Sequence, residues 1–241
     1  MSAALLIARR EFAAYLRTWL GYLITAGVLA VWGVMFNAFV LGRGPLRSSE
    51  VLGSFFWVTS GLIMVVAPLF SMRLLAEERN TGTIHLLYSS PVRDGEIILG
   101  KFLACYGFFA LFVLSTLYMP ALIFVNGKVS LGHIAAGYLG LMLIGAASVA
   151  LGVLASSLTK SQVVSAILAG CFIALLVLCW TLARVTERPL SDVFNSLALW
   201  NEHFPPFQHG VVHLRDVVYY LAVTYVALFA STRVLEARRW R

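Results

Sequence analysis

Residues 129–183 read VSLGHIAAGYLGLMLIGAASVALGVLASSLTKSQVVSAILAGCFIALLVLCWTLA. Within this stretch a single charged residue, Lys160, separates uncharged runs of 31 residues (129–159) and 23 residues (161–183). A bilayer core about 30 Å thick is crossed by roughly 20 helical residues that rise about 1.5 Å each. The stretch therefore predicts two membrane-spanning helices joined by a short polar turn.

Uncharged runs of the same kind occur elsewhere in the chain, at 18–42, 51–72, 102–127 and 217–232. The composition agrees with them, because 60% of the 241 residues are hydrophobic, only 12% are charged and the mean hydropathy is +0.87. A soluble domain carries about 25% charged residues, so an ordinary soluble globule is excluded. We predict an all-α polytopic membrane protein, a single transmembrane domain over 1–241, with six spans at about 18–42, 51–72, 102–125, 134–158, 162–183 and 213–233.

The basic residues predict how the spans are oriented. If both ends of the chain lie on one side, that side holds 12 of the 18 Lys and Arg residues and the other side holds 6. Cytoplasmic loops carry the excess of basic residues, so we expect both termini in the cytoplasm. Residues 1–17 have the pattern of an amphipathic helix at the bilayer surface. A nucleic-acid patch is the weaker explanation of the +7 net charge, because the basic residues cluster at span ends; no nucleic acid is expected as a partner.

The predicted spans lack the side chains that membrane enzymes and ion-coupled carriers use. No charged residue and none of the five histidines lies at mid-membrane, whereas coupled transporters usually keep an ionisable group at that depth. Patterns for a zinc protease, a nucleophile with its base or paired haem ligands are missing as well. We therefore expect no catalytic, metal or cofactor site in this chain, and a secondary transporter or channel is disfavoured.

Small and hydroxylated residues recur instead in the fourth predicted span. Ser148, Gly152 and Ser156 are spaced four residues apart and lie on one helical face. Small residues at such spacing allow neighbouring helices to approach closely. Helix packing is the favoured interpretation, and a polar path for a substrate is the alternative.

The segment between the second and third spans carries charges of both signs. Residues 73–101 read RLLAEERNTGTIHLLYSSPVRDGEIILGK and include a short apolar helical piece at 84–88. A short helix between two long spans suits docking onto a cytoplasmic partner, and a solvated loop is the alternative. Gly95, Gly100 and Lys101 fit the nucleotide-loop spacing G-x-x-x-x-G-K, but Phe102 stands where Ser or Thr would ligate magnesium. We interpret that match as chance, since these residues belong to a helix entering the membrane.

This loop resembles the signature of ABC-2 type permeases, the membrane halves of ATP-driven exporters. The residues that carry the resemblance are Ala76-Glu77-Glu78-Arg79, Gly82-Thr83, Leu86-Leu87, Ser90-Pro91-Val92 and Gly100-Lys101. The end of the chain is similar to the gliding-motility-associated branch of these permeases, the GldF type. The residues that match there are Glu202-His203-Phe204, Pro206-Phe207, Gly210-Val211, Leu214-Arg215-Asp216, Tyr219 and the tail 233–241.

The resemblance implies a type V exporter-like permease fold in the bacterial cytoplasmic (inner) membrane. Two permease subunits, identical or related, would form the pore, and two separate ABC ATPase subunits would bind ATP and Mg²⁺. A partner with a large extracytoplasmic domain is left open. Residues 73–101 would be the cytoplasmic coupling loop, in which Gly82 would allow a sharp turn. The residues that would contact or position the ATPase are Glu77, Glu78, Arg79, Gly82, Thr83, Leu86, Leu87 and Pro91.

The longest external segment, 184–212, mixes polar with large apolar residues, so it is not expected to extend freely into water. From related permeases we expect a re-entrant hairpin with short helices at 191–200 and 208–215 and a turn at Pro205–Pro206. His209 and His213 could share a metal ion, but interfacial polar anchors are the favoured explanation. The predicted extracytoplasmic gate consists of Trp200, Phe204, Pro205, Pro206 and Phe207.

Two functions fit these observations. The chain is either the permease subunit of an ABC exporter or a membrane scaffold that couples a separate ATPase to a motility or assembly complex without transport. Both share the fold and the ATPase partner, so the sequence leaves them open, along with the substrate and the identity of the second permease subunit. In either case ATP hydrolysis belongs to another subunit, and the chain is not an enzyme.

Overall fold

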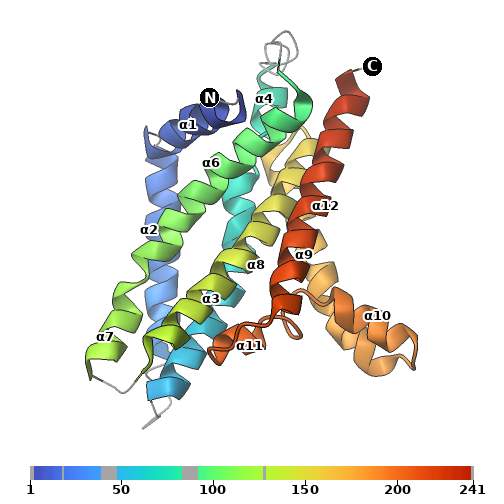
Figure 1. Ribbon diagram of the computed structural model, residues 1–241. Helices are drawn as coiled ribbons and strands as arrows, with labels where there is room; N and C mark the ends of the chain where they lie inside the picture. The colour runs from blue at the N-terminus through green and yellow to red at the C-terminus, as the bar shows by residue number, and fades with distance from the viewer. Residues whose placement is uncertain (1–2, 18, 39–47, 83–91, 127–128, 240–241) are drawn as a thin grey trace.

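In the computed structural model the chain is described for residues 3–17, 19–38, 48–82, 92–126 and 129–239, and this part is helical with no strand. Six long helices run between the two ends of a bundle, and α1 lies across one end (Figure 1). The helices are α1 (Ala3–Arg17), α2 (Trp19–Phe36), α3 (Ser48–Ser71), α4 (Ala76–Asn80), α6 (Asp94–Ser115), α7 (Tyr118–Asn126), α8 (Leu131–Leu158), α9 (Gln162–Val185), α10 (Leu190–Leu197), α11 (Pro205–Gln208) and α12 (Leu214–Arg239).

The two ends of the bundle carry different elements. Helix α1, helix α4 and the end of α12 lie at the upper end in Figure 1, which we call the α4 end. The short helices α10 and α11 lie at the opposite end, which we call the α11 end. The first described helix and the end of the last one therefore lie at the same end of the bundle as α4.

The helical membrane-protein class predicted from composition is confirmed. Among the described residues, five helical stretches are long and apolar enough to cross a bilayer: 48–80, 94–124, 131–158, 162–185 and 214–238. The first predicted span, 18–42, contains α2, but residue 18 and residues 39–42 lie outside the described part. That this first segment crosses the membrane therefore stays a prediction.

Helix α8 forms the centre of the bundle. Of its most apolar 18-residue window 78% is buried, against 22% for each of α9 and α12. Glycines let neighbours reach its backbone: a Cβ on Gly152 would lie 1.8 Å from the Ser71 hydroxyl of α3, and one on Gly145 would lie 2.2 Å from the Phe109 ring of α6. The close approach predicted for this face thus occurs at Gly152, whereas the Ser148 hydroxyl bonds within its own helix to the Ile144 carbonyl.

The third predicted span is two helices rather than one. Helix α6 ends at Ser115, and α7 begins at Tyr118. Pro120 explains the break, because a proline has no N–H to donate and its ring clashes with the carbonyl four residues earlier, here that of Thr116. The helix begins at Asp94, ahead of the apolar run that starts at position 102, and there the Glu96 carboxylate accepts a hydrogen bond from the Arg93 N–H at 3.2 Å.

The external hairpin also differs from the expectation in detail. Its first helix, α10, covers much of the predicted 191–200, but the helix expected at 208–215 is absent, and α12 begins at Leu214. Pro205 and Pro206 do not form a turn between helices; they are the first residues of α11. Proline is well suited to that position, since the first N–H groups of a helix have no partner within it.

Candidate functional site

The α4 end contains the part of the coupling loop that the structure describes. After α3 the chain passes through residues 72–75 into α4 and then turns at Gly82, whose φ of +75° is one that L side chains rarely adopt. A glycine can adopt this conformation without the steric cost that a side chain would add. Among the other predicted coupling residues, Thr83, Leu86, Leu87 and Pro91 lie outside the described residues.

Ser156 of α8 holds the start of α4. Its hydroxyl accepts hydrogen bonds from the backbone N–H groups of Leu75 and Ala76, both at 3.0 Å, and donates one to the Met72 carbonyl at 3.1 Å. The first N–H groups of a helix need such an acceptor. Arg79, in the same short helix, donates to the Ser157 carbonyl. Both α4 and the turn that precedes it are therefore fixed to the end of α8.

Two adjacent glutamates of α4 have different surroundings. Glu77 forms a two-point contact with Arg73, at 2.9 Å to Nε and 3.2 Å to an Nη, and its side chain is 40% exposed. The hydrogen bond that Arg73 donates to Glu77 raises the pKa of Arg73. Glu78 is only 18% exposed, and its carboxylate accepts a hydrogen bond from Lys101 at 2.7 Å. Glu77 thus faces outward, while Glu78 points into the bundle.

Lys101 occupies a buried position on α6. Its side chain is 1% exposed, and its ammonium also lies 3.7 Å from the Glu11 carboxylate of α1. Burial alone would raise the pKa of Glu11, but attraction to Lys101 and a hydrogen bond from Arg10 outweigh it and lower that pKa. The residues that match the nucleotide-loop spacing, 95–101, all lie within α6. They form a helix and no loop, so the spacing does not describe a phosphate cradle.

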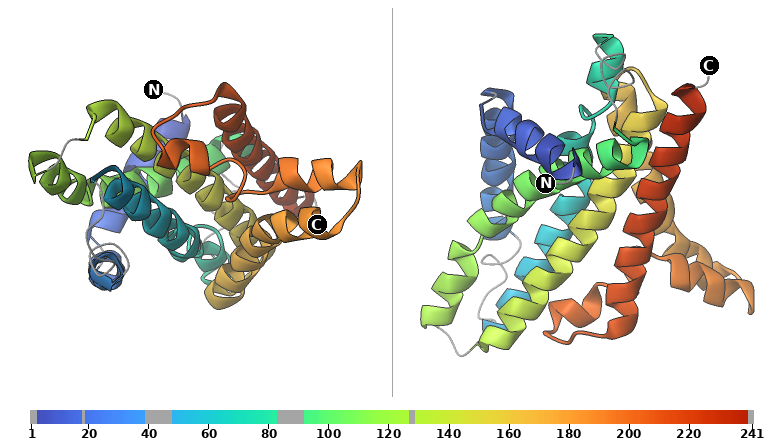
Figure 2. Two further views of the ribbon diagram at one scale, coloured as in Figure 1. Left: turned by 90° about the horizontal axis from the view of Figure 1, so that it is seen from below. Right: turned by 45° about the horizontal axis from the view of Figure 1, so that its top comes forward.

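Helix α1 packs closely on α6 (Figure 2, right), and its Glu11 lies beside Lys101. A Cβ on Gly100 would lie 2.7 Å from the Ala4 carbonyl and 2.9 Å from the Ile7 side chain. At the other end of α1, the Tyr15 hydroxyl donates to the Phe70 carbonyl of α3 at 2.8 Å, and its ring stacks on Phe108 at 5.3 Å. Helix α1 is therefore attached to both α6 and α3.

The structure brings Glu77, Glu78, Arg79 and Gly82 together in and just after α4, as one segment of the loop. Sequence reasoning missed the role of Lys101 and Glu11, and it assigned Ser156 to helix packing alone. A lysine directly before the apolar run 102–127 was the available signal, because such a residue is seldom fully buried without a charged partner.

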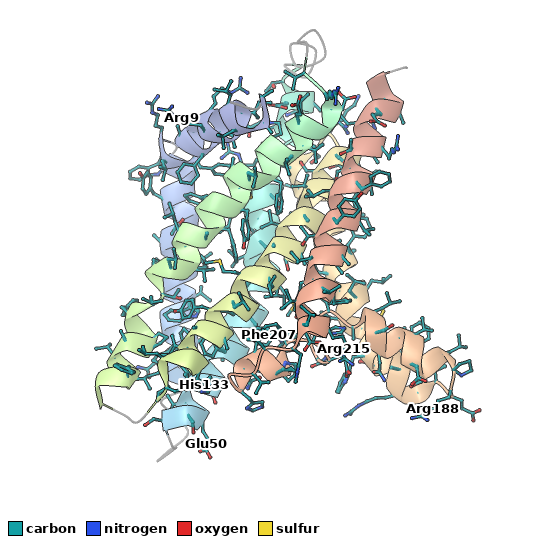
Figure 3. All side chains as sticks on the ribbon, in the orientation of Figure 1. Arg9, Glu50, His133, Arg188, Phe207 and Arg215 are labelled. Carbon is teal, nitrogen blue, oxygen red and sulfur yellow. The ribbon has the colours of Figure 1, made fainter. Side chains whose placement is uncertain are left out.

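At the α11 end, the predicted gate residues close over α3 and α8. The Trp200 indole N–H donates to the Ser60 hydroxyl at 2.9 Å, and its ring lies 5.4 Å from that of Trp57. Phe204 and Phe207 are buried, and a Cβ on Gly140 would lie 2.6 Å from the Phe207 Cβ. Figure 3 shows Phe207 of α11 close to the start of α8. These side chains form an apolar plug at this end.

A polar pair lies next to this plug. His203 Nδ1 and the Asp216 carboxylate are 2.7 Å apart, and both side chains are almost fully buried. Arg215 at the start of α12 donates to Glu202 at 3.1 Å, and Glu202, His203 and Arg215 line a cavity of about 460 Å³. The candidate metal residues His209 and His213 are not part of this pair, and no three His, Cys, Asp or Glu side chains in the described part gather as metal ligands would.

These features define the class as a polytopic helical membrane protein with a short charged helix at one end. A family model for ABC-2 family transporter proteins matches residues 5–233, so the chain belongs to that family. A comparison with curated proteins found no match.

Proposed function

We propose that this chain is the membrane-spanning permease subunit of an ABC transporter, that a separate cytoplasmic ATPase drives it and that it exports a substrate. In this proposal the chain lies in a bacterial inner membrane, and its α4 end faces the cytoplasm. The family membership supports the permease role. The basic residues support the orientation, since 12 of the 18 lie at this end when six spans are drawn.

The observation that carries the proposal is the attachment of α4. A helix of five residues has little stability of its own, yet here Ser156 and Arg79 tie it to α8 and Glu78 ties it to α6. A displacement of α4 therefore moves α6 and α8 as well, which a flexible loop would not do. The exposed carboxylate of Glu77 gives the segment an outward contact point for the ATPase.

Two helices connect this segment to the opposite end. Helix α3 leads directly into α4 and carries Ser60, the partner of Trp200, while α8 holds α4 through Ser156 and packs on Phe207 at Gly140. A displacement of α4 therefore reaches both α3 and α8, and the plug of Trp200, Phe204 and Phe207 rests on those two helices. This arrangement supports transmission from the ATPase to the exit.

The partners follow from the same proposal. Two ATPase subunits bind ATP and Mg²⁺, and a second permease subunit, identical or related, completes the pore. Helices α9 and α12 expose apolar side chains along their length, such as Leu175 and Phe229; lipid and the second subunit would cover them. Membership of the gliding-motility-associated branch, and a partner with a large extracytoplasmic domain, remain part of the proposal.

The test is ATP hydrolysis by the chain co-expressed with its ABC ATPase and reconstituted in vesicles. We expect hydrolysis only when the ATPase is present, and acceleration when the transported substrate is added. Hydrolysis by the isolated chain would contradict the proposal. Turnover that responds to a bound protein complex and to no substrate would favour the scaffold function instead.

A further inference from the structure

Lys101 is in an unusual place for a lysine. It lies two turns into α6 with 1% of its side chain exposed, although lysine is rarely buried without a partner. Its long side chain could reach water at a surface position at little cost. The burial of Lys101 therefore indicates that its positive charge has a role at this position of α6.

The partners of Lys101 come from two other elements. Its ammonium lies 2.7 Å from the Glu78 carboxylate of α4 and 3.7 Å from the Glu11 carboxylate of α1. We call these three residues the Lys101 cluster. Its members are separated by 67 and 23 positions in sequence (101 − 78 = 23 and 78 − 11 = 67), so the cluster joins three separate segments of the chain.

The charges explain why the lysine matters. Two carboxylates at 18% and 20% exposure share one ammonium. The ammonium supplies an attraction that both carboxylates share, in poorly solvated surroundings where such an attraction is strong. Arg10 pairs with Glu11 from the neighbouring position on α1, and its charge also interacts with Glu78, but its side chain is 68% exposed. Among the described ion pairs, Lys101 lies within pairing distance of both Glu11 and Glu78.

The backbone beside the cluster is packed without space. Gly100, the neighbour of Lys101, lies directly under α1, where even a Cβ would collide with the Ala4 carbonyl. Helix α1 cannot slide along α6 without breaking this contact and moving Glu11 away from Lys101. The cluster and the glycine contact therefore fix the same position of α1.

We propose that Lys101 is a positioning residue that locks α1 and α4 onto α6, so that these three elements move as one body. In the proposed transporter, a displacement imposed on α4 would then reach α1 and α6 as well as α8. The source of the displacement rests on the proposed function, whereas the lock is a property of the chain alone and is tested without an ATPase.

The test measures the distance between spin labels on α1 and α4 in the full chain, purified and embedded in lipid nanodiscs. Arg9→Cys and Asn80→Cys supply the labels at two exposed positions, in a background where Cys105, Cys171 and Cys179 are alanine. We expect a single narrow distance distribution in the background protein. Lys101→Met should raise the population of separated states about tenfold, the change that a coupled pair of ordinary size produces.

Four further variants make the test specific. Glu78→Gln and Glu11→Gln should each broaden the distribution less than Lys101→Met, and they serve in its place if that variant does not fold. Lys101→Arg keeps a positive charge beside Glu78 and Glu11 and should keep the distribution narrow. Glu77→Gln is the matched control: Glu77 pairs with Arg73 of its own segment, and the distance distribution should stay as narrow as in the background protein.

Two results would overturn the proposal. One is an unchanged distribution in Lys101→Met, or in both Glu78→Gln and Glu11→Gln. The other is a distribution that is as broad in Lys101→Arg as in Lys101→Met, which would mean that the positive charge does not hold the helices. Neither result depends on whether the chain binds an ATPase.

Discussion

At the α4 end the elements meet through charged and hydroxyl side chains, whereas at the α11 end they meet mainly through aromatic rings. Lys101, Glu78 and Ser156 join α1, α4, α6 and α8 through directional polar contacts. Phe204 and Phe207 instead fill the space under α11. Elements joined by hydrogen bonds and ion pairs keep the same partners when they move together, whereas packed rings can separate by losing buried area. We therefore interpret α4 with its contacts as the part that transmits movement, which we call the lever, and the aromatic plug as the part that opens.

The largest effect should come from emptying the plug. Phe207→Ala removes a fully buried ring from the contact with Gly140 and should cost about 3–5 kcal/mol of stability at the α11 end. Thermal unfolding of the purified protein measures it. Leu190→Ala, at an exposed position on α10, is the control and should change the midpoint little. An equal decrease of the unfolding midpoint in Phe207→Ala and Leu190→Ala would show that the Phe207 ring does not stabilise the α11 end.

A smaller effect is expected at the lever. Ser156→Ala leaves the N–H groups of Leu75 and Ala76 without their acceptor, and each unsatisfied buried group costs about 1–3 kcal/mol. Protease sensitivity of the 72–82 segment should rise, while the rest of the bundle stays resistant. Ser148→Ala is the matched control, because that hydroxyl bonds only within α8. If both variants are cut alike, Ser156 does not hold α4.

The comparison also indicates which parts of the molecule the sequence could predict. The uncharged apolar runs indicate α3, α8, α9 and α12, because a helix that crosses a bilayer needs a minimum number of apolar residues, and that number can be counted in the sequence. Gly82 was placed at a turn for a similar local reason. By contrast, Lys101 acquires its role from α1, which crosses α6 from 90 positions earlier in the chain (101 − 11 = 90). The local spacing around Lys101 matches only a nucleotide-loop pattern, which we interpret as chance, and it carries no information about α1.

The α11 end was less predictable for the same reason. Pro205 and Pro206 are compatible both with a turn and with the first turn of a helix, and only the packing of Phe207 on α8 distinguishes the two. His203 and Asp216 lie 13 positions apart, on either side of α11, so no local pattern pairs them. Tertiary contacts decide these features.

A further effect should be seen at Trp200, at the edge of the plug. Trp200→Phe keeps an aromatic ring but loses the hydrogen bond to Ser60, a net loss of about 0.5–1.5 kcal/mol. Ser60→Ala should give a similar decrease in unfolding temperature, and the double variant should lose little more. Additive losses in the double variant would mean that the two side chains act independently.

The smallest effect concerns acid. The pKa of Glu11 is lowered in the folded chain, so its contribution is complete above its unfolded pKa of about 4.3 and is lost as pH falls through the lower folded value. The α1–α4 label distance should therefore stay narrow near neutral pH and broaden in acid below about pH 4. Glu11→Gln should broaden it at neutral pH already and reduce the acid dependence. If Glu11→Gln broadens in acid in the same way as the unchanged protein, the protonation of Glu11 does not cause the broadening.

The central claim is that the ATPase docks on the outward face of α4. The most direct measurement is the affinity of the co-expressed ABC ATPase for the purified chain when one exposed carboxylate is reversed at either end. Glu77→Lys lies on α4, and Glu187→Lys is the same change at an exposed position before α10, at the opposite end. We predict weakened binding for Glu77→Lys alone. Unchanged binding for Glu77→Lys, or an equal loss for Glu187→Lys, would contradict the account.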